Sequence, residues 1–231
     1  MERGNWKDWI KRYLVFLIGL LLNSFGVAFV TNADLGASPI AAIPYSLSMI
    51  LPQLTLGNWV ILFNITLIVI QAIIQGKNAN KAQLGLEVVI AFCFGYGVDL
   101  AMFCLQALHP AHYPLKLISM IAGCMIIALG AYLEVLADVA MLPGDAFVNA
   151  IAKGLRRQYG GVRVISDISM SVVAGILCIL FLHELSGVRE GTILSALLVG
   201  NMVKIFAKLL ASPTAHLLPP RTVHSAEQGN E

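Results

Sequence analysis

Long apolar stretches are the feature of this sequence that most limits its fold. A helix that crosses a bilayer needs roughly 20 mostly apolar residues, because the hydrocarbon core is about 30 Å thick and backbone polar groups within it must be satisfied internally. Six stretches have this length, and we expect each to be a transmembrane helix: 12–31, 57–75, 84–105, 117–137, 164–183 and 191–210. The fold class that follows is an all-α polytopic membrane protein.

Two shorter apolar stretches lie between these spans. They cover residues 37–51 and 141–155, and each contains or follows prolines. Stretches of this length suit half-membrane helices, which enter and leave on one side, better than full spans.

The composition agrees with a membrane location. Charged residues make up 12% of the chain, whereas a soluble domain typically carries about a quarter. The net charge of +2 is too small, and its basic residues too scattered, to predict nucleic-acid binding. The four cysteines fall in or beside spans without metal-ligand spacing, so we expect them to pack and expect no metal or cofactor. The first apolar stretch lacks a signal-peptide cleavage site and is expected to be retained.

An internal repeat becomes visible when the sequence is shifted by 104 positions against itself. The shift aligns the following pairs without a gap: Gly19 with Gly123, Gly26 with Gly130, Asp34 with Asp138, Pro39 with Pro143, and Gly57 with Gly161. Apolar residues match easily in membrane proteins, but Gly, Asp and Pro in one register are harder to obtain by chance. We therefore predict two related halves, 12–105 and 106–210, between a cytoplasmic segment 1–11 and a disordered cytoplasmic tail 211–231. Two unrelated halves with coincident turns are the alternative.

The two short segments decide the topology. If they do not cross, each half has three spans, and the second half must be inserted upside down relative to the first. Lys and Arg favour the cytoplasmic side of short loops. A six-span chain with both termini inside leaves Lys116 and Arg189 outside, whereas eight spans would send Lys77 and Lys81 out and bring Lys116 in. We prefer six spans in inverted repeats.

Several acidic residues lie where charge is costly. Asp34 and Asp138 follow the first and fourth spans, each five residues before a proline. They either cap the short helices or meet near the midplane and line one pocket between the repeats. Asp145 stands near the start of the second short segment, where the first half has Ala41. It is either an ordinary helix-start carboxylate or part of a ligand site.

Other polar residues fall within the spans. Arg163 and Asp167 are spaced i, i+4, so an ion pair that only joins helices and a functional pair are both open. Glu134 precedes Asp138 by one turn; the two either share a proton in a dry interior or are exposed at the membrane interface. Asn64 is explained by interhelical hydrogen bonding.

Two further pairs are not expected to form sites. Glu87 and Asp99 lie twelve residues apart in the third span, so they project about 120° from each other. His109 and His112 flank a proline in a short loop, where a solvated turn is favoured over a metal pair. No P-loop, Gly-x-Ser-x-Gly or His-Glu-x-x-His motif is present, and we expect no enzymatic activity.

The second half resembles a known family. The matching stretches are Met141-Leu-Pro-Gly-Asp145, Gly161-Val-Arg-Val-Ile165 with Asp167, and Gly187-Val-Arg-Glu-Gly-Thr192, together with Ala33-Asp-Leu-Gly-Ala-Ser-Pro39 in the first half. They resemble the YczE-like (YczE/YitT-type) family of uncharacterised bacterial inner-membrane proteins, over roughly residues 12–210. Asp145 stands where this family leads us to expect Glu, and Arg163 where it leads us to expect Lys. The resemblance implies a multi-pass inner-membrane protein and supplies no substrate.

A last hypothesis concerns the start of the final span. Arg189, Glu190 and the free N–H groups of the first turn would form a donor-rich cap able to hold a small anion, with a plain interfacial cap as the alternative.

The leading functional hypothesis is a small-molecule or ion transporter with its site between the two repeats. The alternatives are a non-transporting accessory or scaffold protein and a substrate-binding subunit of a larger transporter. Expected partners are membrane lipid, an unknown small-molecule or ion substrate and a second copy in a homo-oligomer. The candidate substrate-binding residues are Asp34, Pro39, Asn64, Asp138, Asp145, Arg163, Asp167, Arg189 and Glu190.

Overall fold

The computed structural model describes residues 6–76, 79–107 and 112–217, together with the side chains of all of these except residues 7 and 211–217. Every regular element in these ranges is a helix. In chain order they are α1 (Trp6–Asn32), α2 (Pro39–Ile50), α3 (Leu56–Gln75), α4 (Lys81–Cys104), α5 (Tyr113–Ala137), α6 (Pro143–Leu155), α7 (Tyr159–Leu182) and α8 (Glu190–Leu217).

The six predicted spans are confirmed as helices long and apolar enough to cross a membrane: α1, α3, α4, α5, α7 and α8. The two predicted short helices are α2 and α6. Most helices extend a few residues beyond the apolar stretches, because polar flanks continue the backbone hydrogen bonding. At the start of α4, for example, the Asn80 side chain accepts hydrogen bonds from the N–H groups of Ala82 and Gln83.

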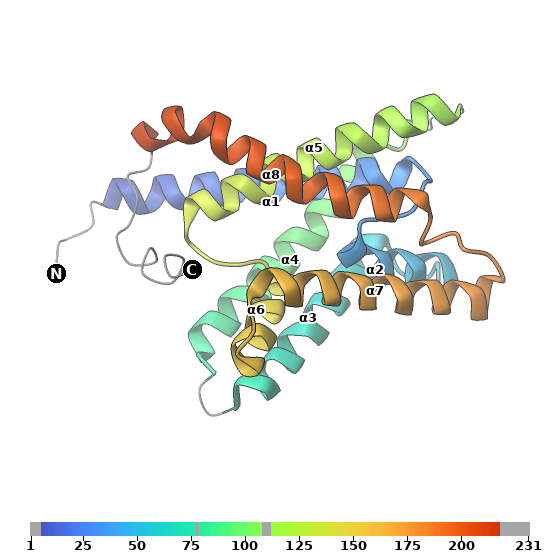
Figure 1. Ribbon diagram of the computed structural model, residues 1–231, viewed down its shortest axis with the longest axis horizontal. Coiled ribbons are helices and arrows are strands. Elements are labelled where there is room, and N and C mark those ends of the chain that lie inside the picture. The colour runs from blue at the N-terminus through green and yellow to red at the C-terminus, as the bar shows by residue number, and fades with distance from the viewer. Residues whose placement is uncertain (1–5, 77–78, 108–111, 218–231) are drawn as a thin grey trace.

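Helices α1 and α5 cross closely and run antiparallel (Figure 1). Small residues face each other in reverse order along the two helices, Gly19 opposite Gly130 and Gly26 opposite Gly123. A Cβ added to Gly26 would lie 2.7 Å from Ile127 N, and one added to Gly130 would lie 2.8 Å from Asn23 N. Glycine therefore lets the two backbones approach, as small residues do in membrane helix pairs.

Asp34 and Asp138 end the long helices and do not cap the short ones. Both have positive φ angles, 53° and 48°, and Asp138 is the left-handed C-cap residue of α5. Asp tolerates this conformation better than most residues because its short side chain can bond locally. The N-cap residues of α2 and α6 are Ser38 and Leu142, and neither side chain makes a cap bond. The capping interpretation of the two aspartates was wrong.

The predicted repeat would relate α1–α4 to α5–α8, and the helix contacts are compatible with it at most places. Helix α4 packs on α1, and α8 packs on α5; α2 packs on α7, and α3 on α6. The two halves differ at one place: α3 and α4 pack together extensively, whereas α7 and α8 make little or no contact. Figure 1 shows α7 and α8 apart from each other and connected by the loop that follows α7.

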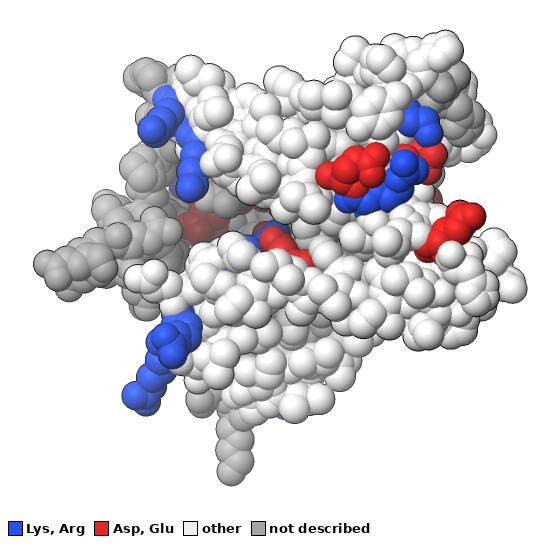
Figure 2. Space-filling view, turned by 45° about the vertical axis from the view of Figure 1, so that its right-hand side comes forward, with Lys and Arg blue, Asp and Glu red and all other residues white. Residues whose placement is uncertain are grey.

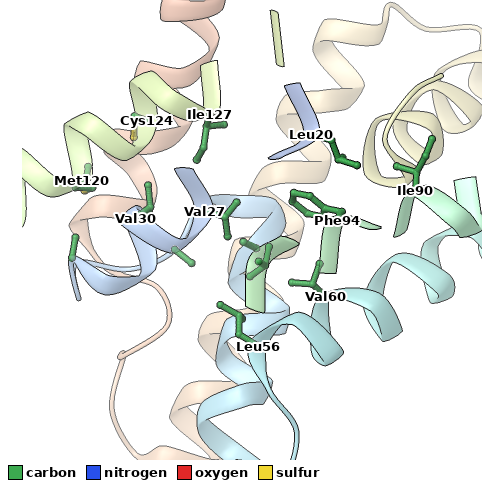
Figure 3. Packing of buried hydrophobic residues seen from close by; sticks show 14 of the residues in the cluster. Leu20, Val27, Val30, Leu56, Val60, Ile90, Phe94, Met120, Cys124 and Ile127 are labelled. Carbon is green, nitrogen blue, oxygen red and sulfur yellow. The ribbon is translucent and has the colours of Figure 1, made fainter. Parts of the chain in front are cut away.

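The main core lies where α1, α3, α4 and α5 meet (Figure 3). Its side chains are mostly medium-sized and apolar, with Val27 and Val30 from α1 and Ile127 from α5 near the crossing. A second, smaller cluster includes Val148 and Ala152 of α6. The core fixes α1, α4 and α5, and the two short helices are held against α3 and α7.

Candidate functional site

Charged side chains gather at two places in the described part of the chain. We name the first the Arg163 cluster, which consists of Asp145, Tyr159, Arg163 and Asp167. Arg163 pairs with Asp145 through one guanidinium nitrogen and with Asp167 through Nε at 3.2 Å. The same nitrogen that meets Asp145 lies 3.1 Å from the Tyr159 hydroxyl, which in turn donates to Asp145 at 3.4 Å.

Local sequence explains how this cluster forms. Pro143 occupies the first turn of α6, a position that costs it no hydrogen bond, and Asp145 follows in the same turn, where a carboxylate complements the helix dipole. Tyr159, Arg163 and Asp167 are spaced four residues apart on α7 and share one face. The predicted Arg163–Asp167 ion pair is confirmed, and Asp145 joins it from another helix.

The Arg163 cluster is half-buried. The exposed fractions are 31% for Arg163, 38% for Asp145 and 23% for Asp167. It holds two carboxylates against one guanidinium, so with all three groups ionised its net charge is −1. A site of this kind can accept a small cation, exchange a carboxylate partner of Arg163, or take up a proton.

The second group is the Asp34 cluster, which consists of Asp34, Lys116, Arg189 and Glu190. Lys116 Nζ lies 2.7 Å from Asp34 Oδ2. Arg189 donates to the Asp34 backbone carbonyl at 3.2 Å and approaches Glu190 Oε1 at 3.5 Å. An open depression of about 420 Å³ adjoins the cluster and is lined by Asp34, Glu184, Leu185, Ser186 and Arg189.

Backbone pairing holds the Asp34 cluster together. Ala37 N donates to Gly187 O at 3.2 Å, and Gly191 N donates to Leu35 O at 2.8 Å. Gly36 adopts φ +100°, and a Cβ there would lie 2.7 Å from Arg189 N. The two stretches that carry the family resemblance, around Gly36 and around Gly187–Thr192, therefore lie against each other.

These contacts bear on the anion-cap hypothesis. Gly191 N, in the first turn of α8, is bonded to Leu35 O, and Thr192 N to Arg189 O. Arg189 is engaged with Asp34 O and Glu190. With these donors bonded within the protein, the geometry fits the plain interfacial cap better than an anion site.

The two clusters lie at opposite ends of α7. Arg163 lies one turn into this helix, and Arg189 comes after its end, so about 19 helical residues, or about 29 Å, separate them along the axis. On the face shown in Figure 2, acidic and basic side chains likewise gather in two places, one toward the right and one in a hollow near the centre. One pocket that holds all nine predicted residues is therefore excluded.

Three predicted site residues belong to neither cluster. Pro39 is buried in the first turn of α2. Asn64 is buried in α3 and donates to the Val60 carbonyl of its own helix at 2.9 Å, not across to a neighbouring helix. Asp138 is exposed at the end of α5.

The predicted meeting of Asp34 and Asp138 near the midplane was wrong. Asp34 pairs with Lys116 near the start of α5, whereas Asp138 follows the end of α5, so about 22 residues and about 33 Å separate the two along the helix. The hypothesis that Glu134 and Asp138 share a proton was also wrong. Glu134 is buried and accepts from Asn23 Nδ2 at 3.3 Å, while Asp138 is exposed.

Sequence reasoning missed three polar contacts. The contact of Lys116 with Asp34 was missed because Lys116 was considered for topology alone. Its position 104 residues after Arg12 is a signal, because Arg12 makes a similar contact, with the Ala137 carbonyl, at the other end of the α1/α5 pair. The spacing of Tyr159 from Arg163 could have placed it in the cluster. Asp99 was considered only as an unlikely neighbour of Glu87; it accepts from Gly57 N at 2.7 Å and from the Thr55 hydroxyl at 2.6 Å at the start of α3.

Metal ligation finds no support among the described residues, where no group of three or more His, Cys, Asp or Glu could hold an ion. His112 is the N-cap residue of α5, and His109 lies outside the described residues. All four cysteines are free; Cys124 and Cys178 are buried, as the packing interpretation expects, while Cys93 and Cys104 are exposed.

Comparison with known proteins places the chain in a family. A family model described as "Family of unknown function (DUF6198)" matches residues 10–208. The chain belongs to this family. It is 26% identical over 200 residues to "Uncharacterized protein YyaS" of Bacillus subtilis (strain 168), which covers 86% of this chain and 94% of that protein. No solved structure matches the chain significantly.

The family assignment refines the expectation from sequence. The family that matches is DUF6198, and the YczE-like name is not the one found. The broader expectation, an uncharacterised family with a helical, membrane-like chain, is confirmed.

Proposed function

We propose that this DUF6198 protein is a membrane transporter for a small cation or zwitterion, and that the Arg163 cluster is its binding site. The observation that carries the proposal is a half-buried guanidinium between two carboxylates from different helices, with one carboxylate in excess. Ionisable groups within membrane segments are rare, and each is by default a candidate functional position.

The difference between the halves supports a ligand role. In the register of the repeat, Asp145, Arg163 and Asp167 correspond to Ala41, Trp59 and Phe63. A purely structural contact between the short helix and the next span is made without charge in the first half, where α2 packs on α3. The charges are thus not needed for the packing itself.

The helix arrangement supports an inverted repeat. Helices α1 and α5 are antiparallel, as the Gly19–Gly130 and Gly26–Gly123 contacts require. If both cross the membrane, an even number of crossings lies between them, which α3 and α4 supply while α2 does not cross. Oppositely inserted repeats with broken helices are a common transporter architecture.

The position of basic residues fits the same topology. Lys116 and Arg189, the two that the six-span arrangement leaves outside, both contact Asp34. They therefore lie at one end of the helix bundle. The chain would be a multi-pass membrane protein with α2 entering from the outer side and α6 from the cytoplasmic side.

Transport can be tested with purified protein in proteoliposomes on a solid-supported membrane. Charge movement is recorded on addition of small inorganic cations, amines, amino acids and carboxylates. We expect one cationic or zwitterionic class to give a signal that is lost in Asp145→Asn and Asp167→Asn. Asp138→Asn is the matched control, because this carboxylate is exposed and outside the cluster. Normal signals in both cluster variants would refute the site. No charge movement with any class, together with no uptake of the same compounds in radiolabelled form, would refute transport.

One observation favours an accessory or scaffold protein instead. In the most apolar stretch of α8, 6% of the residues are buried, against 50% for α1 and α5. Such a helix offers a long face to another chain as well as to lipid. Co-purification of a stoichiometric second protein after mild detergent extraction, together with no transport signal, would favour this function.

A further inference from the structure

A buried polar pair joins α3 to α4, away from both charged clusters. Gln71 and Glu87 are both 0% exposed. Gln71 Nε2 donates to Glu87 Oε1 at 3.2 Å, and Gln83 Nε2 donates to the same oxygen at 2.9 Å. The other carboxyl oxygen, Glu87 Oε2, and the Gln71 amide oxygen have no hydrogen-bond partner.

Both unpartnered atoms are acceptors, so neither can satisfy the other while Glu87 is a carboxylate. Buried polar atoms in native proteins are almost always bonded, and a buried, unpaired charge is more costly still. A donor is therefore required between the two groups. The amide nitrogen of Gln71 already bonds one carboxyl oxygen, so the amide and carboxyl groups are in direct contact.

A single proton supplies that donor. A protonated carboxyl group has one O–H donor and keeps an acceptor oxygen. With the proton on Oε2, Glu87 donates to Gln71 Oε1 while Gln71 Nε2 donates to Glu87 Oε1. Carboxylic acid and amide then form a ring of two hydrogen bonds, and both unpartnered atoms are satisfied.

Among the described residues, no neighbouring charge stabilises a carboxylate at this position. Helices α1, α3 and α6 pack against α4, and α3 contains no charged residue. On α1, α4 and α6, the basic residues with described side chains are Lys11, Arg12, Lys81 and Lys153. Arg12 donates to Ala137 O, the three lysines are exposed, and no ion pair joins any of the four to Glu87.

The acidic groups on these helices, and Glu134 on α5, have other positions or partners. Asp99 binds the start of α3, Asp145 pairs with Arg163, Glu134 on α5 bonds Asn23, and Asp8 lies near the start of α1. None bonds Glu87. Gln83, which is exposed at the surface, does bond Glu87, so the carboxyl group lies one side chain from the exterior.

We propose that Glu87 and Gln71 form a buried proton-binding site, in which the carboxyl group of Glu87 holds a proton taken from the aqueous phase and donates it to the Gln71 amide oxygen. The site lies in the first half and is independent of the proposed transport function. It gives the α3/α4 interface a buried carboxyl group that binds and releases a proton.

Infrared difference spectroscopy on the full-length protein in detergent tests the site. The spectrum of Glu87→Gln is subtracted from that of wild type at neutral pH. We expect a protonated-carboxyl C=O band that shifts on exchange into D2O. Glutamine at 87 imitates the protonated acid, because its NH2 group can donate to Gln71 Oε1, and the variant should remain folded. Glu184→Gln is the control, because this exposed carboxylate should leave carboxylate bands in its difference spectrum.

Two outcomes overturn the proposal. A carboxylate band in the wild-type minus Glu87→Gln difference shows an ionised group, and its movement on replacing Na+ with choline would identify a bound metal cation in place of the proton. An acid band that stays unmoved in Gln71→Met would show that the proton is not shared with the amide. If Glu87→Gln does not fold, the difference between wild type and Gln71→Met tests the proposal instead, because this variant should shift the acid band without removing it.

Discussion

Replacing Gly26 with alanine tests the close crossing of α1 and α5 on which the fold depends. A Cβ at this position would lie 2.5 Å from Ile127 Cγ1, 2.7 Å from Ile127 N and 2.9 Å from Gly123 O. The isoleucine side chain can turn away, but the nitrogen and oxygen belong to the backbone of α5, so the helices must separate. Overpacking of this kind costs typically about 1–3 kcal/mol, and we expect about 2 kcal/mol.

The expected loss can be measured as a shift in the melting midpoint in detergent. For a chain of this size, 1 kcal/mol corresponds to about 2–4 °C, so Gly26→Ala should lower the midpoint by about 4–8 °C. Gly200→Ala is the matched control: it lies within α8 with nothing within 4 Å of the added Cβ, and alanine favours the helix by about 1 kcal/mol. Equal midpoints for the two variants would refute the close crossing.

Three further predictions follow from local geometry. Gly36→Ala should lower the midpoint more than Gly76→Ala, because both have positive φ but only position 36 also meets neighbouring atoms; equal losses would show that backbone strain alone decides. In a background without native cysteines, Glu184→Cys should react with a membrane-impermeant thiol reagent on intact cells while Lys81→Cys is protected, and the reverse pattern would contradict the topology. Asp99→Ala should cost about 1 kcal/mol through loss of the α3 cap, and an unchanged denaturation midpoint would contradict this role.

The spans could be predicted because hydrocarbon thickness sets their length whatever they pack against. Helix ends could not, because they depend on contacts remote in sequence. The start of α3 shows this: Thr55 follows a turn, but the carboxylate that bonds it and Gly57 N comes from Asp99 on α4. No pattern near Thr55 signals that partner.

The contacts of the candidate site also fall into those that the sequence predicted and those that it did not. Arg163 and Asp167 were paired from sequence because i, i+4 neighbours share a helix face. The contact between Lys116 and Asp34 spans 82 positions and depends on the antiparallel crossing of α1 and α5, which the apolar pattern does not specify. Asp34 and Asp138 were placed together because each precedes a short helix, whereas the left-handed conformation that each adopts ends the preceding helix. Antiparallel crossing then carries them to opposite ends.

Helix contacts of the two predicted halves match at most places, whereas their polar chemistry does not. At each end of the α1/α5 pair, a basic residue of one helix meets the chain where the other helix ends, Lys116 with Asp34 and Arg12 with Ala137 O. These contacts repeat because both halves need the same helix ends. The Arg163 cluster has no charged counterpart at 104 positions earlier, where Trp59 stands. Groups that the shared architecture requires should occur twice, so a costly charged group present once is better explained by a task that the two membrane faces do not share.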